Sequence, residues 1–182
     1  SNIWRKTEGI DRNMVYFLEN HDEQRLASDF FAKNAMNGKA AMLLTAFMGR
    51  GATMVYFGQE VGEKGMDVEG FSGRDGRTTI FDYWSSDAVR RFAGDDHSYV
   101  GKDLTAEEKS LREWYKNVLS LAHGSMVFDF GSMFDLMYVN LDSYDKGQKI
   151  YAFLRYTNNE RYLIVANFSS DATEATIRIP EH

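Results

Sequence analysis

The segment MVYFLENHDEQR, residues 14–25, places an unbroken apolar run directly before a cluster of polar side chains. The apolar part, Met14 to Leu18, contains β-branched and aromatic residues and predicts a strand buried on both faces, as in a parallel sheet. The polar part, residues 19–25, carries hydrogen-bonding and ionisable groups at nearly every position. Such a cluster is typical either of a solvated loop after a buried strand or of the rim of a catalytic site. Both interpretations are open at this point.

The composition limits the class of protein. The chain has 182 residues, of which 43% are hydrophobic and 14% aromatic, so it can form a hydrophobic core. Its formal net charge of −6 argues against a nucleic-acid partner or an anionic membrane surface, which would require clustered Lys and Arg. Without cysteine it has no disulfides and no thiolate metal site. No apolar run is long enough to cross a bilayer, and no signal peptide is visible.

A helix and a second strand are predicted after the opening segment. Ser28 or Asp29 can cap a helix, and Gly49 and Gly51 can end it. A second unbroken apolar run, residues 54–57, then ends in the sequence GQE. Helical spacing relates the apolar residues between these limits, which are Phe30, Phe31, Ala35, Met36, Ala40, Leu43, Leu44, Phe47 and Met48.

Strand, helix and strand in this order predict a βαβ unit with two parallel strands. Parallel strands present their carboxyl ends at the same side of a sheet, where α/β proteins bind ligands. The polar residues after Leu18 and those after Phe57 are therefore expected to face one crevice, with Asp22 and Glu60 at a shared mouth.

The middle of the chain predicts a long loop and an amphipathic helix. Residues 62–76 contain five glycines and mixed charges, which indicates a loop. The neighbours Asp95, Asp96 and His97 have poor spacing for metal ligands, so a metal is not expected there. Thr105 and Glu108 form a capping-box pattern. The stripe behind it, Leu111, Trp114, Tyr115, Val118, Leu119 and Ala122, predicts a helix that packs on a core and ends at Gly124.

After about residue 125 the pattern changes to short segments rich in β-formers. These predicted strands are residues 126–130, 136–140, 150–156, 162–168 and 175–179, with a hairpin turn at residues 157–160. They predict an antiparallel β-sandwich without catalytic residues. The predicted domains are residues 1–124 and residues 125–182.

The motifs together resemble the C-terminal part of the α-amylase family of glycoside hydrolases, glycoside hydrolase family 13. FLENHD, residues 17–22, is similar to the seventh-strand signature that ends in Asn-His-Asp. GATMVYFGQE, residues 51–60, is similar to the eighth strand, and RTTIFDYW, residues 77–84, to the loop that follows. NFS, residues 167–169, resembles a strand ending of the C-terminal β-domain. The resemblance implies the fold class: α/β plus all-β, the C-terminal part of a (β/α)8 TIM barrel, lacking the first six barrel strands, followed by the antiparallel β-sandwich.

The resemblance also implies roles for individual residues. Asp22 would be the third carboxylate of the active site, which hydrogen-bonds the sugar hydroxyls and favours an oxocarbenium-like transition state. His21 would bind the same sugar as one member of a buried His-Asp pair. Asn20, Arg25 and Gln59 are further expected substrate-binding residues. Arg77 and Asp82 are expected to pin the long loop by an ion pair, and Tyr83 and Trp84 could stack on a sugar or pack on the barrel.

Two catalytic groups are missing from the sequence. A retaining glycosidase uses a nucleophile and an acid/base about 5 Å apart, and the resemblance places both on the fourth and fifth barrel strands, which the chain does not contain. We therefore expect the isolated chain to hydrolyse nothing, although its parent would be an α-amylase or a neopullulanase-like enzyme acting on α-glucans such as starch and maltodextrins. Unpaired strand edges and uncovered apolar faces also predict self-association.

Two other classes of protein stay open. The chain could be a non-catalytic carbohydrate-binding or interaction module derived from the same fold, although the retained His21–Asp22 pair favours an enzyme. It could also be an unrelated α/β protein with an open sheet. No metal or cofactor is expected in this chain; calcium is common in the family, with ligands in a part that this sequence lacks. The family resemblance favours an extracellular, periplasmic or cell-surface location, which the sequence itself does not determine.

Overall fold

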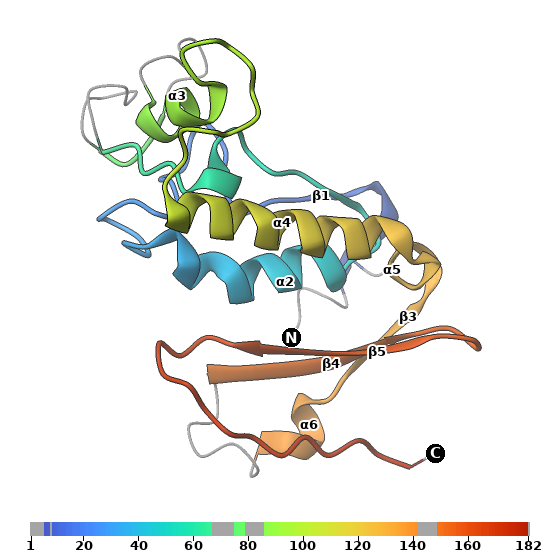
Figure 1. The fold of residues 1–182 in the computed structure, drawn as a ribbon. Coiled ribbons are helices and arrows are strands. Elements are labelled where there is room, and N and C mark those ends of the chain that lie inside the picture. Colours follow the sequence, from blue (N-terminus) through green and yellow to red (C-terminus); the bar gives the residue numbers. More distant parts are fainter. Residues whose placement is uncertain (1–5, 8, 67–74, 79–85, 142–148, 182) are drawn as a thin grey trace. The chain divides into compact units, whose positions relative to one another are not determined.

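The computed structural model describes residues 6–7, 9–66, 75–78, 86–141 and 149–181. The chain divides into two compact units, each built from separate stretches of sequence. Unit 1 comprises Ser1–Tyr16, Ala40–Ala52 and Ser120–His182, and unit 2 comprises Phe17–Lys39 and Thr53–Leu119. The predicted domain boundary at residue 124 stays a prediction, because this division follows spatial contacts. Figure 1 labels the elements of both units.

Unit 1 contains a three-stranded antiparallel sheet in the order β3–β4–β5. The strands are β3 (Ser132–Asp135), β4 (Ile150–Tyr156) and β5 (Arg161–Asn167). The pairing of β4 with β5 runs in register from Ile150 opposite Asn167 to Tyr156 opposite Arg161. At the turn, the Thr157 N–H donates to the Glu160 carbonyl at 2.9 Å. The two central strands of the predicted β-domain and their hairpin turn are therefore confirmed.

Three other strands predicted after residue 125 are wrong. Residues 126–130 form the helix α5 (Met126–Phe130), because the Ser125 hydroxyl accepts a hydrogen bond from the Val127 N–H and caps it. Residues 136–140 contain the helix α6 (Met137–Asn140), whose first N–H donates to the Asp135 carboxylate at 2.8 Å. Residues 175–179 form no strand.

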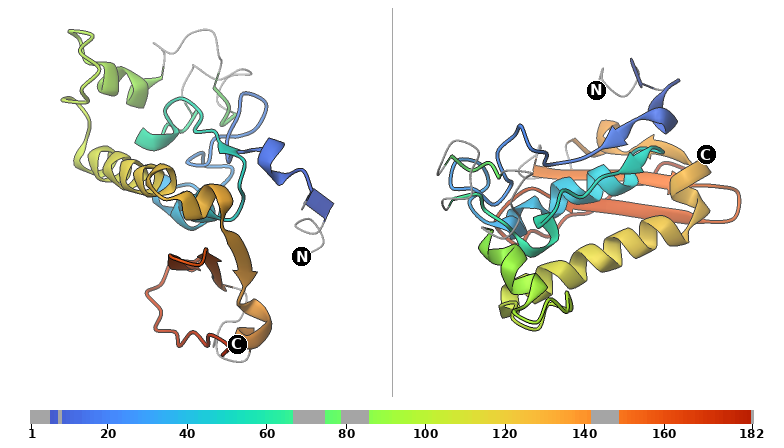
Figure 2. Two further views of the ribbon diagram at one scale, coloured as in Figure 1. Left: turned by 90° about the vertical axis from the view of Figure 1, so that its right-hand side faces the viewer. Right: turned by 90° about the horizontal axis from the view of Figure 1, so that it is seen from above.

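The segment after β5 and the helix α6 lie on the same side of the sheet (Figure 2). The Asn140 side chain joins the two: it donates to the Arg178 carbonyl at 3.0 Å and accepts from the Arg178 N–H at 2.7 Å. The Asn140 side chain thus bonds the N–H and the carbonyl of Arg178, groups that in a strand would bond a neighbouring strand. The described residues form one sheet in this region, and a β-sandwich is not confirmed.

The Arg155 side chain on β4 is fully buried and is surrounded by backbone carbonyls. It has no ion pair with a carboxylate among the described residues. Burial lowers the pKa of Arg155 to about 10. Its two terminal nitrogens donate at 2.6 to 3.2 Å to six carbonyls at and after the ends of α2 (Lys39–Phe47) and α5, those of Phe47, Met48, Gly49, Val127, Phe128 and Gly131. The Val127 carbonyl also accepts from the Gly131 N–H at 2.9 Å. Because the six carbonyls lie in or just after the last turns of α2 and α5, where backbone acceptors lack helical partners, Arg155 stabilises both helix ends.

A second buried charge in unit 1 belongs to Asp11, which is 3% exposed and lies in the 3-10 helix η1 (Asp11–Asn13). The Arg50 guanidinium donates to both carboxylate oxygens, from Nε at 2.7 Å and from Nη2 at 2.8 Å. The hydrogen bond from Arg50 is the largest influence on the pKa of Asp11 and holds it below the ordinary value. The pair therefore favours the ionised form of Asp11 in the folded chain.

The opening strand is shorter than predicted, and the second strand is displaced. β1 covers only Val15–Tyr16, and β2 is Ala52–Thr53 instead of residues 54–57. The two form a two-stranded sheet. Residues 54–57 are not a strand, because side chains occupy their backbone groups: the Gln59 amide accepts from the Tyr56 N–H, and Arg25 donates to the Phe57 carbonyl. The order strand, helix, strand is confirmed, and the parallel direction of the strands stays a prediction.

The first long helix begins later than Ser28 or Asp29. The Ser28 carbonyl accepts from the N–H groups of Phe31 and Lys33, which closes a turn. Lys33 then has a left-handed backbone with φ of 64°, which an α-helix excludes. The Asn34 side chain accepts from the Met36 N–H and caps η2 (Ala35–Gly38), which leads into α2.

The amphipathic helix predicted before Gly124 is confirmed as α4 (Ala106–Gly124). Its buried residues, Leu111, Tyr115 and Val118, belong to the predicted stripe. The capping box is also present: the Thr105 N–H donates to the Glu108 carboxylate at 2.8 Å, and the Glu108 N–H donates to the Thr105 hydroxyl at 3.2 Å. Unit 2 further contains η3 (Gln59–Val61) and α3 (Asp87–Ala93). Within the described residues, no helix has the length and apolar character that a membrane span requires.

Candidate functional site

The candidate site is the loop Asn20–Gln24 of unit 2, which follows the opening apolar run. The Asn20 side-chain oxygen accepts from the N–H groups of Asp22 and Glu23, both at 2.9 Å. This is the local turn that an Asn favours by bonding the backbone two and three residues ahead. Asn20 therefore shapes the loop that presents His21 and Asp22, and its predicted contact with substrate stays a prediction.

His21 and Asp22 are the exposed members of this loop. Their side chains are 54% and 77% exposed, and the His21 Nε2 lies 3.4 Å from the Asp22 Oδ2. The expectation of a buried His-Asp pair is wrong, because both side chains are more than half exposed. The exposure leaves a carboxylate and an imidazole open to a ligand from solvent. Together they can accept and donate hydrogen bonds to neighbouring hydroxyls.

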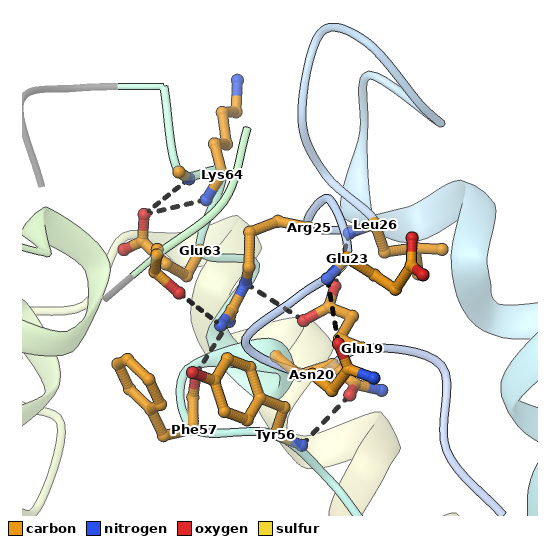
Figure 3. A network of polar contacts seen from close by, with 12 residues as sticks. Glu19, Asn20, Glu23, Arg25, Leu26, Tyr56, Phe57, Glu63 and Lys64 are labelled. Carbon is orange, nitrogen blue, oxygen red and sulfur yellow. Dashed lines mark hydrogen bonds and ion pairs between the residues drawn. The ribbon is translucent and has the colours of Figure 1, made fainter. Parts of the chain in front are cut away.

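Glu19 and Arg25 lie on either side of the loop and form a buried ion pair (Figure 3). The Glu19 residue is 1% exposed, and its Oε2 lies 3.1 Å from the Arg25 Nε. The other carboxylate oxygen accepts from the Leu26 N–H at 2.6 Å. Burial raises the pKa of Glu19, while the Arg25 charge and the Leu26 N–H oppose that shift. The carboxylate is thus held from two directions.

Arg25 is fully buried and connects the loop to two other segments of unit 2. Its Nη2 donates to the Phe57 carbonyl at 2.7 Å, and its Nη1 donates to the Thr78 hydroxyl at 3.1 Å. The guanidinium carbon lies 4.9 Å from the ring centroid of Tyr56 and 5.4 Å from that of Phe57. Figure 3 shows both rings beside the guanidinium. Such stacking on aromatic rings is favourable for a desolvated cation.

Gln59 is 2% exposed and is also used internally. Its amide nitrogen donates to the Tyr115 hydroxyl at 3.0 Å, and its amide oxygen accepts from the Tyr56 N–H at 3.2 Å. Burial raises the pKa of Tyr115 to about 12, so this hydroxyl keeps its proton at neutral pH. The side chains of Arg25 and Gln59 therefore bond the segments that surround the loop. Their predicted contact with substrate stays a prediction.

Other predicted polar residues have separate environments. Arg77 pairs with Asp75 at 2.6 Å, whereas its expected partner Asp82 lies outside the described residues, as do Tyr83 and Trp84. Asp96 pairs with Lys102 at 2.7 Å. Within the described part of the chain, no group of three or more His, Asp or Glu residues could hold a metal ion.

The sequence interpretation missed Glu19 and Thr78 as parts of this arrangement. The sequence did contain a signal for the role of Glu19, because this acidic residue follows an apolar run and an arginine lies six positions later. Thr78 had none, because nothing in a sequence places residue 78 against residue 25.

The comparison with protein families identifies the chain. The sequence model of the family described as "Alpha amylase, catalytic domain" matches residues 2–117, which include the loop, its buried pair and most of α4. The chain belongs to the α-amylase family. This confirms the resemblance inferred from the motifs at residues 17–22, 51–60 and 77–84.

Two solved structures of the α-amylase family fold are similar to the chain. A mutant isomaltulose synthase from Erwinia rhapontici, solved in complex with sucrose, matches with a TM-score of 0.53 and 18% identity over 93% of this chain and 38% of its own. A trehalose-6-phosphate hydrolase from Bacillus licheniformis matches with a TM-score of 0.50 and 18% identity over 85% of this chain and 34% of its own. The chain thus spans little more than a third of these proteins. No match was found among curated protein sequences.

Proposed function

We propose that this chain carries the sugar-gripping part of the active site of a retaining α-glucan hydrolase, with starch and maltodextrins as the substrate class. Asp22 hydrogen-bonds the hydroxyls of the sugar at the cleavage point, and His21 binds the same sugar. The observation that supports this proposal most strongly is the exposed His21–Asp22 pair on a turn built by Asn20, in a chain that belongs to the α-amylase family.

The chemistry of Asp22 is electrostatic and positional in this proposal. The leaving group departs from an anomeric carbon that gains positive charge, and a carboxylate bonded to sugar hydroxyls favours that charge. Hydrogen bonds to the 2-hydroxyl that strengthen in the transition state can contribute several kcal/mol. Asp22 neither attacks the anomeric carbon nor protonates the leaving group in this scheme.

The nucleophile and the acid/base are expected on parts of the α-amylase fold that this sequence does not contain. We therefore propose that the isolated chain binds a glucan without cleaving it. Assays with starch and with a nitrophenyl maltoside test the second half of this statement. Turnover by the purified chain that disappears in an Asp22→Asn variant would overturn it.

Calorimetric titration with maltotriose tests whether the isolated chain binds a glucan. Asp22→Asn removes the negative charge and replaces one of the two acceptor oxygens with an NH2 donor, and it should abolish binding. Glu23→Gln is the matched control, because it removes the same charge one residue along the same exposed loop and should leave the affinity unchanged. Equal affinity of the Asp22→Asn variant and the unmodified chain would contradict the assignment of Asp22.

A second candidate function is a non-catalytic carbohydrate-binding or interaction module with the same fold. The 77% exposure of the Asp22 side chain is compatible with it, because a binding surface needs no enclosed cleft. The two functions differ in the whole protein: a retaining hydrolase needs two further carboxyl groups about 5 Å apart. Mutating those groups should abolish cleavage in an enzyme and change nothing in a binding module.

A further inference from the structure

The Asn20–Gln24 loop is held at both ends by one pair of buried side chains. Glu19 immediately precedes the loop and Arg25 immediately follows it, and their charged groups meet at 3.1 Å. The second Glu19 oxygen bonds the Leu26 N–H, so one carboxylate bridges to two consecutive residues beyond the loop. A five-residue loop whose ends are joined in this way has few conformations open to it.

Arg25, at the C-terminal end of the loop, forms additional hydrogen bonds. The Arg25 N–H donates to the Gly76 carbonyl at 2.5 Å, and its side chain bonds the Phe57 carbonyl and the Thr78 hydroxyl. Arg25 thereby fixes the loop against two segments that are distant in sequence. Asn20 then sets the direction of the backbone within the loop, through its bonds to Asp22 and Glu23.

Stability alone does not explain a charged pair in this position. Glu19 and Arg25 are 1% and 0% exposed, so both charges have lost their water. Desolvation of such a pair consumes most or all of its Coulombic attraction, and apolar residues of similar size are often at least as stabilising. A fork-shaped guanidinium, in contrast, fixes the direction of each of its hydrogen bonds, which an apolar contact does not.

We propose that Glu19 and Arg25 are positioning residues, a clamp that holds the Asn20–Gln24 loop in the conformation in which Asp22 and His21 can grip a sugar. The inference rests on the proposed function of Asp22 and extends it to two residues that touch no ligand. The clamp acts before binding, because a loop that is already ordered loses less conformational entropy when the sugar arrives.

The test compares variants of the clamp with a matched pair elsewhere in the full 182-residue chain. Glu19→Gln removes the clamp charge while keeping the shape, and Arg25→Lys keeps a charge while removing the fork. Asp11→Asn is the control, because it neutralises a carboxylate that is also buried and bonded by an arginine, but in unit 1. Two readouts are taken well below the unfolding temperature: backbone ¹⁵N order parameters of residues 20–24, and the dissociation constant for maltotriose.

Both clamp variants should loosen the loop and weaken binding. We expect order parameters in residues 20–24 to fall from about 0.85 towards 0.6 or less, and the dissociation constant to rise at least about tenfold, because binding then has to order the loop. Asp11→Asn should change neither the order parameters nor the dissociation constant, whatever its effect on the unfolding temperature. A purely structural pair would lower the unfolding temperature and leave both readouts unchanged, and that result would overturn the clamp.

The loop readout separates the clamp from the proposed function. If the unmodified chain binds no maltotriose while Glu19→Gln still loosens residues 20–24, the glucan proposal fails and the clamp stands. Where Glu19→Gln does not fold, Thr78→Val removes a single acceptor from Arg25 and should give the same loosening in weaker form. Unchanged order parameters in Thr78→Val and Arg25→Lys would then overturn the clamp.

Discussion

Each unit contains a fully buried arginine, and the two guanidinium groups are bonded to different kinds of partner. Arg25 in unit 2 meets a carboxylate, a carbonyl, a hydroxyl and two aromatic rings. Arg155 in unit 1 meets six backbone carbonyls and, among the described residues, forms no ion pair. Both donate hydrogen bonds through their two terminal nitrogens, but among the described residues only Arg25 forms an ion pair, with Glu19.

The difference indicates what each arginine does. The partners of Arg155 are the ends of helices and the turns after them, so its loss would leave many carbonyls without a donor and weaken unit 1 as a whole. The partners of Arg25 lie around one five-residue loop, so its loss should affect the conformation of that loop as well as stability. Four experiments follow from this contrast, and we describe them from the largest expected effect on stability to the smallest.

Arg155→Leu should destabilise the chain most. It removes a donor from six carbonyls, of which that of Val127 keeps the Gly131 N–H. Each carbonyl left unsatisfied costs about 1–3 kcal/mol, partly recovered by relaxation and water entry. We expect a loss of about 4 kcal/mol or more in the free energy of urea unfolding. Arg161→Leu is the control, since Arg161 is exposed on β5 of the same sheet, and should cost less than about 0.5 kcal/mol. A loss below about 1 kcal/mol for Arg155→Leu would refute the role assigned to its carbonyl bonds.

A double-mutant cycle on Glu19 and Arg25 should give the next largest effect. Glu19→Gln and Arg25→Met each leave one charge buried without its partner, which costs about 3 kcal/mol. The double variant should cost less than the sum of the two, with a coupling energy of about 1–3 kcal/mol. Unfolding curves of the four proteins measure this quantity. Additive single effects would mean that the two side chains do not act as a pair.

Asp11→Asn should have a smaller, pH-dependent effect. The pKa of Asp11 is lowered in the folded chain, chiefly by its hydrogen bond with Arg50, so the ionised form stabilises the fold above the unfolded pKa of about 4. We expect the variant to lose about 1–2 kcal/mol at pH 7. This difference should shrink as the pH falls below about 4, because Asp11 then takes up a proton, first in the unfolded chain and at lower pH in the folded one. A difference that is constant from pH 7 to pH 3 would contradict the assignment.

Asp22→Asn should change stability least, although it is the variant in which sugar binding is expected to disappear. The Asp22 side chain is 77% exposed, and its close contact with His21 is also exposed. Ion pairs of this kind contribute little, so the free energy of unfolding should change by less than about 0.5 kcal/mol. Thermal unfolding of Asp22→Asn beside Glu23→Gln measures it. A loss above about 1 kcal/mol would show that Asp22 is a structural residue.

The sequence was sufficient for features determined by neighbouring residues. The capping box of Thr105 and Glu108, the apolar stripe of α4 and the hairpin of β4 and β5 each depend on local bonding or on a regular period, and all three are present. The family was also predictable, because its motifs occur in a fixed order. The turn at Asn20 has the same local origin, because an Asn side chain readily bonds the backbone two and three residues ahead.

Sequence reasoning failed where a side chain, near or distant in sequence, bonds the backbone of a segment rich in β-formers. Residues 54–57 have the composition of a strand, but Arg25 and Gln59 occupy their carbonyl and N–H groups. Residues 126–130 are equally rich in β-formers, yet a single hydroxyl, that of Ser125, starts a helix there. The Glu19–Arg25 pair was missed for a different reason, since periodicity predicts which residues are buried but not which buried charges form an ion pair.

The most direct test of the account is an NMR titration of the ¹⁵N-labelled chain with maltotriose. The account predicts that the shifts of the His21 imidazole and of the backbone amides of residues 20–24 change with a common dissociation constant. It predicts that the same changes are absent in Asp22→Asn and retained in Glu23→Gln. Maltotriose-induced shifts that map elsewhere in the chain, or that survive in Asp22→Asn, would contradict the claim that this loop grips the sugar.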